Sequence, residues 1–271
     1  MKSLDGMTIG VIGAGTMGQA LIKGLLAQGL PRRRLRAADP SPAIRNAIAR
    51  RFGIALTDDN LRVVRNADVV ILAVKPQEMP DVTAQLAPRL TRRQLVISIA
   101  AGITLQWLQA RLRNAPVIRV MPNLPATVGC GFSAIARARA ATRRHRAIAL
   151  ELFGAVGDVM ELPERYLDAI TAVSGSGPAY VFFLVQAWEE AARRLGLPAS
   201  VAERAIRQTL KGSAKLLAAN REPAWALVQQ VASKGGTTEA ALRVLAKRRV
   251  AAHLVEALRS AARRSQELSW S

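Results

Sequence analysis

Two patterns of apolar positions divide the first part of the chain into strands and helices. Short runs of apolar, often β-branched residues are typical of strands buried in a parallel sheet, whereas apolar residues at every third or fourth position indicate amphipathic helices. The runs predict strands at residues 7–12, 35–38, 54–56, 68–74, 94–99 and 117–121, with edge strands at 132–136 and 156–161. The helical pattern predicts one helix that ends near Gly29 and others at 41–51, 59–65, 79–87, 104–112 and 143–153.

Beyond Pro163 only the helical pattern continues. It predicts helices at residues 165–173, 179–195, 199–219, 223–232, 238–246 and 250–268. Strands that alternate with helices, followed by helices alone, indicate two domains. We therefore expect an α/β domain with a mostly parallel sheet over residues 1–162, and an all-α domain over residues 163–271.

The helix predicted at 179–195 differs from the others because its first seven residues are all apolar. A helix that is apolar on every side is buried on every side. A contact between two subunits covers such a surface most simply. The sequence therefore predicts a homodimer formed through the helical domain.

Composition and charge bound the class of protein. The formal net charge is +20, but the basic clusters are scattered and only 4% of the residues are aromatic, which leaves few side chains for base stacking. We therefore expect no nucleic-acid partner, although the charge attracts anionic ligands. The chain has one cysteine, Cys130, and we find neither a signal peptide nor an apolar run of membrane-spanning length. We expect a cytoplasmic protein with no membrane partner.

A glycine-rich motif follows the first predicted strand. It reads Gly13-Ala14-Gly15-Thr16-Met17-Gly18. The second strand ends at Asp39, 21 positions after Gly18. This order and spacing are those of a dinucleotide-binding unit, in which Gly13 forms the tight turn, Gly15 admits the pyrophosphate and Gly18 allows close packing of the helix. The sequence therefore predicts a Rossmann domain.

Other segments extend the predicted cofactor site, because ligands of an open α/β sheet bind outside the carboxyl ends of its strands. Together with Asn60, they are Ala73, Val74, Lys75, Pro76, Ala100, Ala101, Gly102 and Asn123. The form of the cofactor stays open between NADH and NADPH. Asp39 favours a ribose 2′-hydroxyl, whereas Arg36, Ser41 and Arg45 lie nearby and suit a 2′-phosphate.

A second glycine-rich segment separates two helices near the C-terminus. It reads Ser233-Lys234-Gly235-Gly236-Thr237-Thr238. Its glycines expose the backbone, and the first N–H groups of the following helix point outward at a positive dipole end. With three hydroxyls and the charge of Lys234 beside them, these groups suit a small carboxylate or phosphate. The alternative is an ordinary break between helices, with Thr238 as a simple N-cap.

Taken together, six segments resemble the Δ1-pyrroline-5-carboxylate reductases, the last enzymes of proline biosynthesis. The segments are G-A-G-T-M-G at 13–18, A-V-K-P at 73–76, S-I-A-A-G at 98–102, R-V-M-P-N at 119–123, V-S-G-S-G-P-A-Y at 173–180 and S-K-G-G-T-T at 233–238. The resemblance spans the chain from end to end. It implies a Rossmann domain with a nicotinamide cofactor and a helical dimerisation domain, and it raises a decamer built as a pentamer of dimers as a further expectation.

The resemblance also implies a reaction, which is hydride transfer from NADPH or NADH to the C=N bond of 1-pyrroline-5-carboxylate to give L-proline. It implies that Thr238 is the catalytic residue, which donates a hydrogen bond to the ring nitrogen. The implied substrate-binding residues are Ser174, Ser233, Lys234, Gly235, Gly236, Thr237 and Thr238. A hydroxyl is sufficient for this chemistry because a cyclic imine is itself basic. Neither histidine, His145 or His253, lies near a motif, and no metal is expected.

Two departures from the family pattern and two other functions stay open. Lys234 stands where many members carry proline, and Leu124 replaces a usual threonine.

One alternative function is that of a related reductase of imines or β-hydroxyacids. Such enzymes tend to carry a catalytic Lys or Asp on the long helix between the domains, however, and residues 179–185 contain neither. The other alternative is a cofactor-sensing or nucleic-acid-binding protein.

Overall fold

The computed structural model describes residues 2–113 and 115–270. The chain forms two compact units. The first, which we call the sheet unit, contains the residues up to Pro178 and those from Ala261 onward, and the second, the helical unit, is Ala179–Ser260. The sequence predicted a boundary after residue 162. The sheet unit extends further because residues 164–170 pack against its last strands, and Ser265 near the C-terminus donates a hydrogen bond to Asp168.

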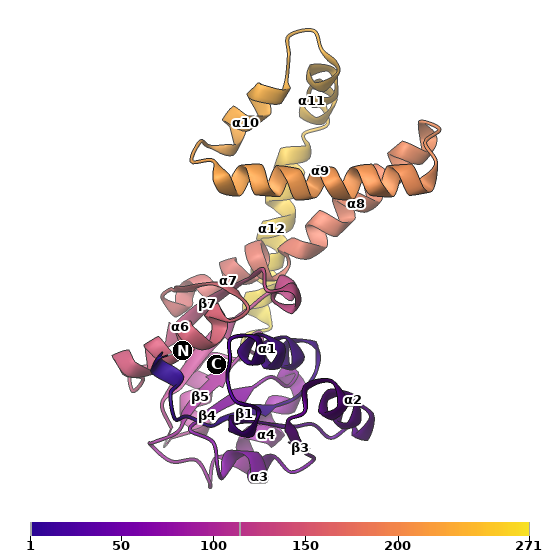
Figure 1. The fold of residues 1–271 in the computed structure, drawn as a ribbon. Helices are drawn as coiled ribbons and strands as arrows, with labels where there is room; N and C mark the ends of the chain where they lie inside the picture. Colours follow the sequence, from indigo (N-terminus) through magenta and orange to yellow (C-terminus); the bar gives the residue numbers. More distant parts are fainter. Residues whose placement is uncertain (1, 114, 271) are drawn as a thin grey trace. The chain divides into compact units, whose positions relative to one another are not determined.

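An eight-stranded sheet forms the centre of the first unit (Figure 1). Its strands are β1 (Ile9–Ile12), β2 (Leu35–Ala38), β3 (Ala55–Thr57), β4 (Val69–Leu72), β5 (Leu95–Ser98), β6 (Val117–Met121), β7 (Gly131–Arg137) and β8 (Gly157–Glu161). They lie in the order β3-β2-β1-β4-β5-β6-β7-β8. The first six run parallel, and β7 pairs antiparallel with β6. The parallel part has the strand order of a Rossmann domain, as predicted.

Helices cover both faces of this sheet, so the sheet unit has three layers. On one face lie α1 (Thr16–Ala27), α2 (Pro42–Phe52) and α6 (Arg143–Gly154), and on the other lie α3 (Asn60–Val64), α4 (Met79–Leu86), α5 (Leu105–Arg111) and α7 (Leu167–Ile170). Alternate strand residues enter the two cores: Ile71 packs in the first and Leu72 in the second. This double burial explains why the strands are apolar at nearly every position.

The helix starts agree closely with the sequence prediction because polar caps set them. The side chains of Ser41, Asp59 and Thr104 accept hydrogen bonds from backbone N–H groups in the first turns of α2, α3 and α5. Each cap satisfies an N–H group that has no partner inside its helix. Short 3-10 helices lie at Lys2–Leu4, Arg32–Arg34, Pro76–Glu78, Leu124–Val128 and Glu164–Tyr166.

The segment between the two predicted helices at 165–173 and 179–195 is itself helical. A stretch of π-helix, Thr171–Gly175, follows α7 and leads into α8 (Gly177–Arg194). At its C-terminal end, the Ser176 N–H donates to the carbonyl of Thr171, 2.8 Å away. The gap that the sequence left between the two helices, residues 174–178, is thus reduced to the bend at Ser176. Pro178 lies in the first turn of α8, where its missing N–H costs nothing. Such widened turns occur frequently at functional sites.

The remaining helices are α9 (Ala199–Ala219), α10 (Ala224–Val231), α11 (Thr237–Lys247) and α12 (Val250–Glu267). In the helical unit, large apolar side chains are exposed on every one of these elements and on α8. Phe182 is 60% exposed and Phe183 is 69% exposed. The single chain thus does not bury the apolar start of α8.

One helical stretch, Glu164–Arg194, is apolar and long enough to cross a membrane by length and composition alone. The uninterrupted apolar run within this stretch covers only residues 179–185 and ends at Gln186, so the sequence predicted no membrane-spanning segment. Interface helices of water-soluble proteins have the same composition.

Candidate functional site

The glycine-rich loop after β1 uses its three glycines in two different ways. Gly13 has a φ of +90°, and a Cβ there would lie 2.8 Å from the backbone of Ala73. A Cβ on Gly18 would lie 2.4 Å from the carbonyl oxygen of Gly13. At Gly15, by contrast, an added Cβ would meet nothing within 4 Å. Gly13 and Gly18 are therefore required by the fold, whereas Gly15 leaves bare backbone open to an approaching group.

Gly15 is also the N-cap of α1, and Thr16 and Met17 are the first two residues of that helix. No side chain caps this helix start. Its N–H groups are therefore available to an anion at the positive end of the helix dipole. The loop fits a pyrophosphate on this evidence, since it combines open backbone with free donors.

Asp39 lies at the end of β2 and is nearly buried, with 7% of its surface exposed. One carboxylate oxygen accepts a hydrogen bond from the Ala14 N–H and the other from the Ser41 N–H, both at 2.9 Å. Asp39 therefore braces the glycine-rich loop against the start of α2. The sequence predicted only a contact with the ribose, and the bracing adds a structural role to it.

Arg45 lies beside Asp39 on α2. Its guanidinium donates to the carbonyl oxygens of Asp39 and Pro40, each at 2.8 Å, and lies 3.6 Å from the carboxylate of Asp58. These contacts hold a positive charge close to the end of β2. A cationic group at this place suits the 2′-phosphate of NADPH.

The ends of β4 and β5 complete the predicted cofactor edge of the sheet. Ala73 donates its N–H to the carbonyl of Ile12, which places the segment 73–76 beside the glycine-rich loop. The segment 100–102 follows β5, the next strand in the sheet. Asn60 begins α3 directly after β3, and its side-chain amide donates to Gln85 on α4. All of these segments follow the carboxyl ends of parallel strands.

Asn123, after β6, is linked to the π-helical stretch. Its side-chain nitrogen donates to the hydroxyl of Ser174 at 3.0 Å and to the Ser174 carbonyl at 3.2 Å, and its oxygen accepts from the Phe132 N–H at 2.9 Å. Asn123 thus fixes the place of Ser174. Its predicted contact with the cofactor stays a prediction.

The segment 233–238 lies in the helical unit, between α10 and α11. Gly235 has a φ of +74°, and the Gly236 N–H donates to the carbonyl of Ser233 at 3.0 Å. Gly236 is the N-cap of α11, so Thr238 is the second residue of the helix. The alternative in which Thr238 caps the helix is therefore wrong.

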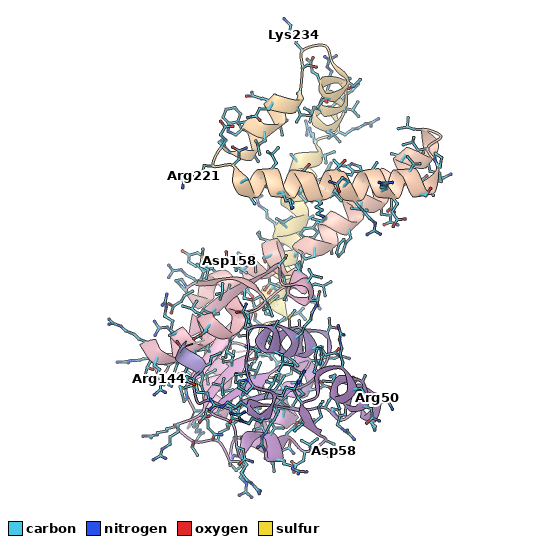
Figure 2. The ribbon with its side chains drawn as sticks, in the orientation of Figure 1. Arg50, Asp58, Arg144, Asp158, Arg221 and Lys234 are labelled. Atoms are coloured by element: carbon cyan, nitrogen blue, oxygen red, sulfur yellow. The ribbon has the colours of Figure 1, made fainter. Side chains whose placement is uncertain are left out.

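The polar groups of this segment remain largely free. Among residues 2–113 and 115–270, the hydroxyls of Ser233, Thr237 and Thr238 form no hydrogen bond. The carboxylate of Glu239 accepts from the Gly235 N–H and lies 3.4 Å from Arg243. Figure 2 shows the side chain of Lys234 pointing away from the helices at the tip of the segment. Free donors at a helix start suit a carboxylate.

His145 has a structural role that the sequence did not reveal. Its ring Nδ1 accepts a hydrogen bond from the backbone N–H of Thr142, and its backbone N–H donates to the Thr142 hydroxyl. The two residues thus cap α6. Burial, with the positive charge of Arg144, lowers the pKa of His145 below its usual value. The lowered pKa favours the neutral ring, the form whose Nδ1 accepts a hydrogen bond.

Sequence reasoning missed the contribution of Trp270, which contacts the loop after β5. It also missed Glu239 and the π-helical stretch. The one local signal for Trp270 is an aromatic residue shortly after an amphipathic helix, in a stretch that is polar except for Leu268. No sequence pattern indicates which loop, 166 positions earlier, accepts it.

Comparisons with known proteins match both parts of the chain. A family model described as "Pyrroline-5-carboxylate reductase dimerisation" matches residues 164–268, and one described as "NADP oxidoreductase coenzyme F420-dependent" matches residues 8–102. The pyrroline-5-carboxylate reductase of Pseudomonas aeruginosa is 44% identical over 264 residues, which cover 96% of each chain.

Two solved structures have the same fold over nearly the whole chain. A pyrroline-5-carboxylate reductase from Coxiella burnetii has a TM-score of 0.91 at 34% identity and covers 98% of this chain and 99% of its own. The pyrroline carboxylate reductase of Plasmodium falciparum with NADP bound has a TM-score of 0.89 at 26% identity, with coverage of 98% and 99%. The 44% identity with the Pseudomonas aeruginosa enzyme extends over nearly the full length of both chains. This chain therefore belongs to the pyrroline-5-carboxylate reductase family.

Proposed function

We propose that this protein reduces the C=N bond of 1-pyrroline-5-carboxylate with NADPH or NADH and releases L-proline. The observation that carries the proposal is the pair of glycine-built anion sites within one chain of this family. One is the open backbone at Gly15, which fits a pyrophosphate, and the other is the segment 233–238, which fits a small carboxylate. A reductase for an anionic imine requires both.

On the cofactor side, the residues 13–18 bind the pyrophosphate, and Asp39 holds that loop in place through its bond to the Ala14 N–H. The segments 73–76 and 100–102 line the strand ends beyond it. The reduced nicotinamide ring supplies a hydride when it is bound. The chain's task at this edge is to fix the ring and to exclude water from it.

On the substrate side, Ser233, Lys234, Gly235, Gly236 and Thr237 bind the carboxylate, and Ser174 assists. The side chain of Thr238 donates a hydrogen bond to the ring nitrogen. The nitrogen becomes more basic as the hydride reaches the neighbouring carbon, so this hydrogen bond strengthens during the reaction. The imine nitrogen is itself basic and takes the proton of the product amine from water, so Thr238 polarises and orients the nitrogen and needs no acidity of its own.

The direct test measures oxidation of NADPH and of NADH side by side in the presence of 1-pyrroline-5-carboxylate, with proline quantified as the product. We expect cofactor oxidation and proline formation in equal amounts with at least one cofactor. Absence of proline with both would reject the proposed reaction.

Replacing Asp39 with Ser is expected to raise the ratio of kcat/KM for NADPH to that for NADH. The replacement removes a negative charge close to the expected 2′-phosphate. We expect the ratio to rise about tenfold, which corresponds to about 1.4 kcal/mol. It also removes both acceptors for the Ala14 and Ser41 N–H groups, so KM should rise for both cofactors. Asp39→Asn keeps one acceptor and serves as the control for the loop. A flat ratio in both variants would show that Asp39 does not face the ribose.

We propose that the exposed apolar residues of the helical unit form the interface of a homodimer. The apolar start of α8 and exposed residues such as Trp225 on α10 form more apolar surface than a monomer leaves in water. On this proposal the long apolar helix faces a second subunit, and the protein is cytoplasmic with no membrane partner. The decamer, a pentamer of such dimers, is the finer proposal.

Phe183→Glu is expected to dissociate the dimer. The side chain is 69% exposed in the single chain, and a buried, unpaired carboxylate in the interface would cost several kcal/mol. Analytical ultracentrifugation and circular dichroism on the same sample separate dissociation from unfolding. Gln186→Glu, which adds the same charge at a polar position of α8, is the matched control. A Phe183→Glu dimer of normal affinity would place the interface elsewhere.

We also propose that the protein has no nucleic-acid partner, because its basic clusters are scattered and only 4% of its residues are aromatic. Glu161 forms hydrogen bonds with Arg137 and Arg146. Burial alone would raise the pKa of Glu161, but the hydrogen bonds and charges of the two arginines outweigh it and lower the pKa. A salt-dependent gel shift with duplex or single-stranded DNA tests this point, and we expect none at physiological salt.

A further inference from the structure

The last described residues of the chain bind to the loop after β5. The Trp270 N–H donates to the carbonyl of Gly102 at 2.8 Å, and the Thr104 hydroxyl donates to the carbonyl of Trp270 at 2.6 Å. Ile103 and Trp270 pair as a parallel β-bridge. We call residues 268–270 the C-terminal strap. The strap adds one short strand pairing to a loop that follows a sheet strand.

Side chains fix the strap in this position. The ring of Trp270 packs edge-on against that of Trp107 on α5, with ring centroids 5.7 Å apart. Arg111 lies 3.8 Å from the centroid of the Trp107 ring, so α5 holds this aromatic partner in place. Before the strap, the Ser265 hydroxyl donates to Asp168 at 2.7 Å. The strap is thus anchored both to α5 and to α7.

The loop is shaped to accept the strap. Gly102 has a φ of +75°, and a Cβ there would lie 2.6 Å from the carbonyl oxygen of Leu268. Only glycine therefore allows the two backbones to approach this closely. Within the sheet unit, the side-chain hydrogen bond to the loop's own segment 100–102 comes from Ser98, at 3.3 Å from the Ala100 N–H. The strap thus restrains the far end of the loop through its bonds to Gly102 and Thr104.

A cavity of about 320 Å³ in the sheet unit lies against the strap. Its walls include Pro76 after β4, Ala101 after β5, and Ser176 at the end of the π-helical stretch. Leu268 and Trp270 form part of the remaining wall. The strap therefore borders the same space as two segments of the predicted cofactor edge.

We propose that the C-terminal strap holds the loop 100–102 in the conformation that binds the nicotinamide cofactor, which makes Trp270 a positioning residue for the reaction. The inference rests on the proposed function, in which this loop lines the cofactor site. A loop that is already ordered loses less conformational entropy when it binds, so a strap that orders it strengthens binding. By linkage, bound cofactor must in turn stabilise the strap.

The test compares Trp270→Ala with the conservative variant Trp270→Phe. We expect Trp270→Ala to raise the calorimetric Kd and the KM for NADPH about tenfold, which is a change of about 1.4 kcal/mol. The KM for 1-pyrroline-5-carboxylate and the kcat at saturating cofactor should stay close to those of the unchanged protein. Trp270→Phe retains the edge-on ring contact and should restore most of the affinity.

Hydrogen exchange of the backbone amides of residues 101–104 tests whether the strap and the cofactor act on the same loop. A purely structural role would not link the exchange of the strap to cofactor binding. We expect faster exchange in Trp270→Ala without cofactor, and slower exchange of both the loop and the strap when NADPH is added to the unchanged protein. If Trp270→Ala does not fold, Trp270→Leu takes its place.

Two outcomes separate failure of the inference from failure of the proposed function. A lower melting temperature with unchanged Kd and KM for NADPH would overturn the strap's role and leave the proposed function intact. Failure of the unchanged protein to bind either nicotinamide cofactor would overturn the proposed function and this inference with it.

Discussion

Gly15→Val is expected to abolish measurable cofactor binding while the protein stays folded. A Cβ at Gly15 meets nothing within 4 Å, and the backbone there has a φ of −67°, which valine adopts without strain. The folded chain therefore has room for the new side chain. The open space is where the pyrophosphate is proposed to lie, so the valine should displace it, with a rise in Kd of at least about a hundredfold.

The matched controls are substitutions at the other two glycines of the motif. In Gly18→Ala the new Cβ would lie 2.4 Å from the carbonyl oxygen of Gly13, and in Gly13→Ala it would strain a φ of +90°. Both variants should unfold at clearly lower temperature, whereas Gly15→Val should lose about 1 kcal/mol or less from the poorer N-cap. Calorimetry and thermal melts on all three separate loss of the ligand site from loss of the fold. Normal affinity in a folded Gly15→Val protein would show that the pyrophosphate does not pass this residue.

The sheet unit was largely predictable because its signals are local. A short apolar run indicates a buried strand, and a capping residue such as Ser41 or Asp59 marks a helix start within one or two residues. The acid at Asp39 and the spacing of the glycines further restrict the order of the strands to the Rossmann arrangement. Prediction succeeds here because each element's sequence agrees with its place in the fold.

The features that were missed depend on contacts between distant segments. Local pattern shows a Gly-Ser-Gly-Pro run after Ser174 as a break, but packing of Gly175 against Met121 and the hydroxyl bond from Thr171 to Leu167 keep the chain helical. The strap is a second case, because its loop and its tryptophan lie far apart in sequence. A third is Asp39, whose two backbone partners are set by the fold.

The predicted roles of the segment 233–238 depend both on local sequence signals and on features that only the folded structure shows. The glycines and threonines are visible in the sequence, whereas the identity of the N-cap is not. Because Gly236 caps α11, the hydroxyl of Thr238 has no capping function to lose. A loss of activity on removal of this hydroxyl can therefore be assigned to the reaction and not to a weakened helix start.

Thr238→Val is therefore expected to lower kcat with little change in stability. Valine keeps the shape and the β-branching of threonine and removes only the hydroxyl. A hydrogen bond to a group that gains basicity in the transition state is worth about 1.5–3 kcal/mol, so the rate should fall about ten- to a hundredfold. Because the bond is stronger in the transition state than in the bound substrate, kcat should change more than KM.

Ser233→Ala and Thr238→Ser are the controls for that result. The carboxylate that Ser233 is proposed to bind keeps its charge throughout hydride transfer, so its loss should raise KM and leave kcat nearly unchanged. Thr238→Ser retains the hydroxyl and should retain most of the turnover. Melting temperatures and steady-state constants on all three variants decide the assignment. If Thr238→Val turned over at the normal rate, the nitrogen would have to be held by another donor, and Thr238 would be a helix residue without a role in the reaction.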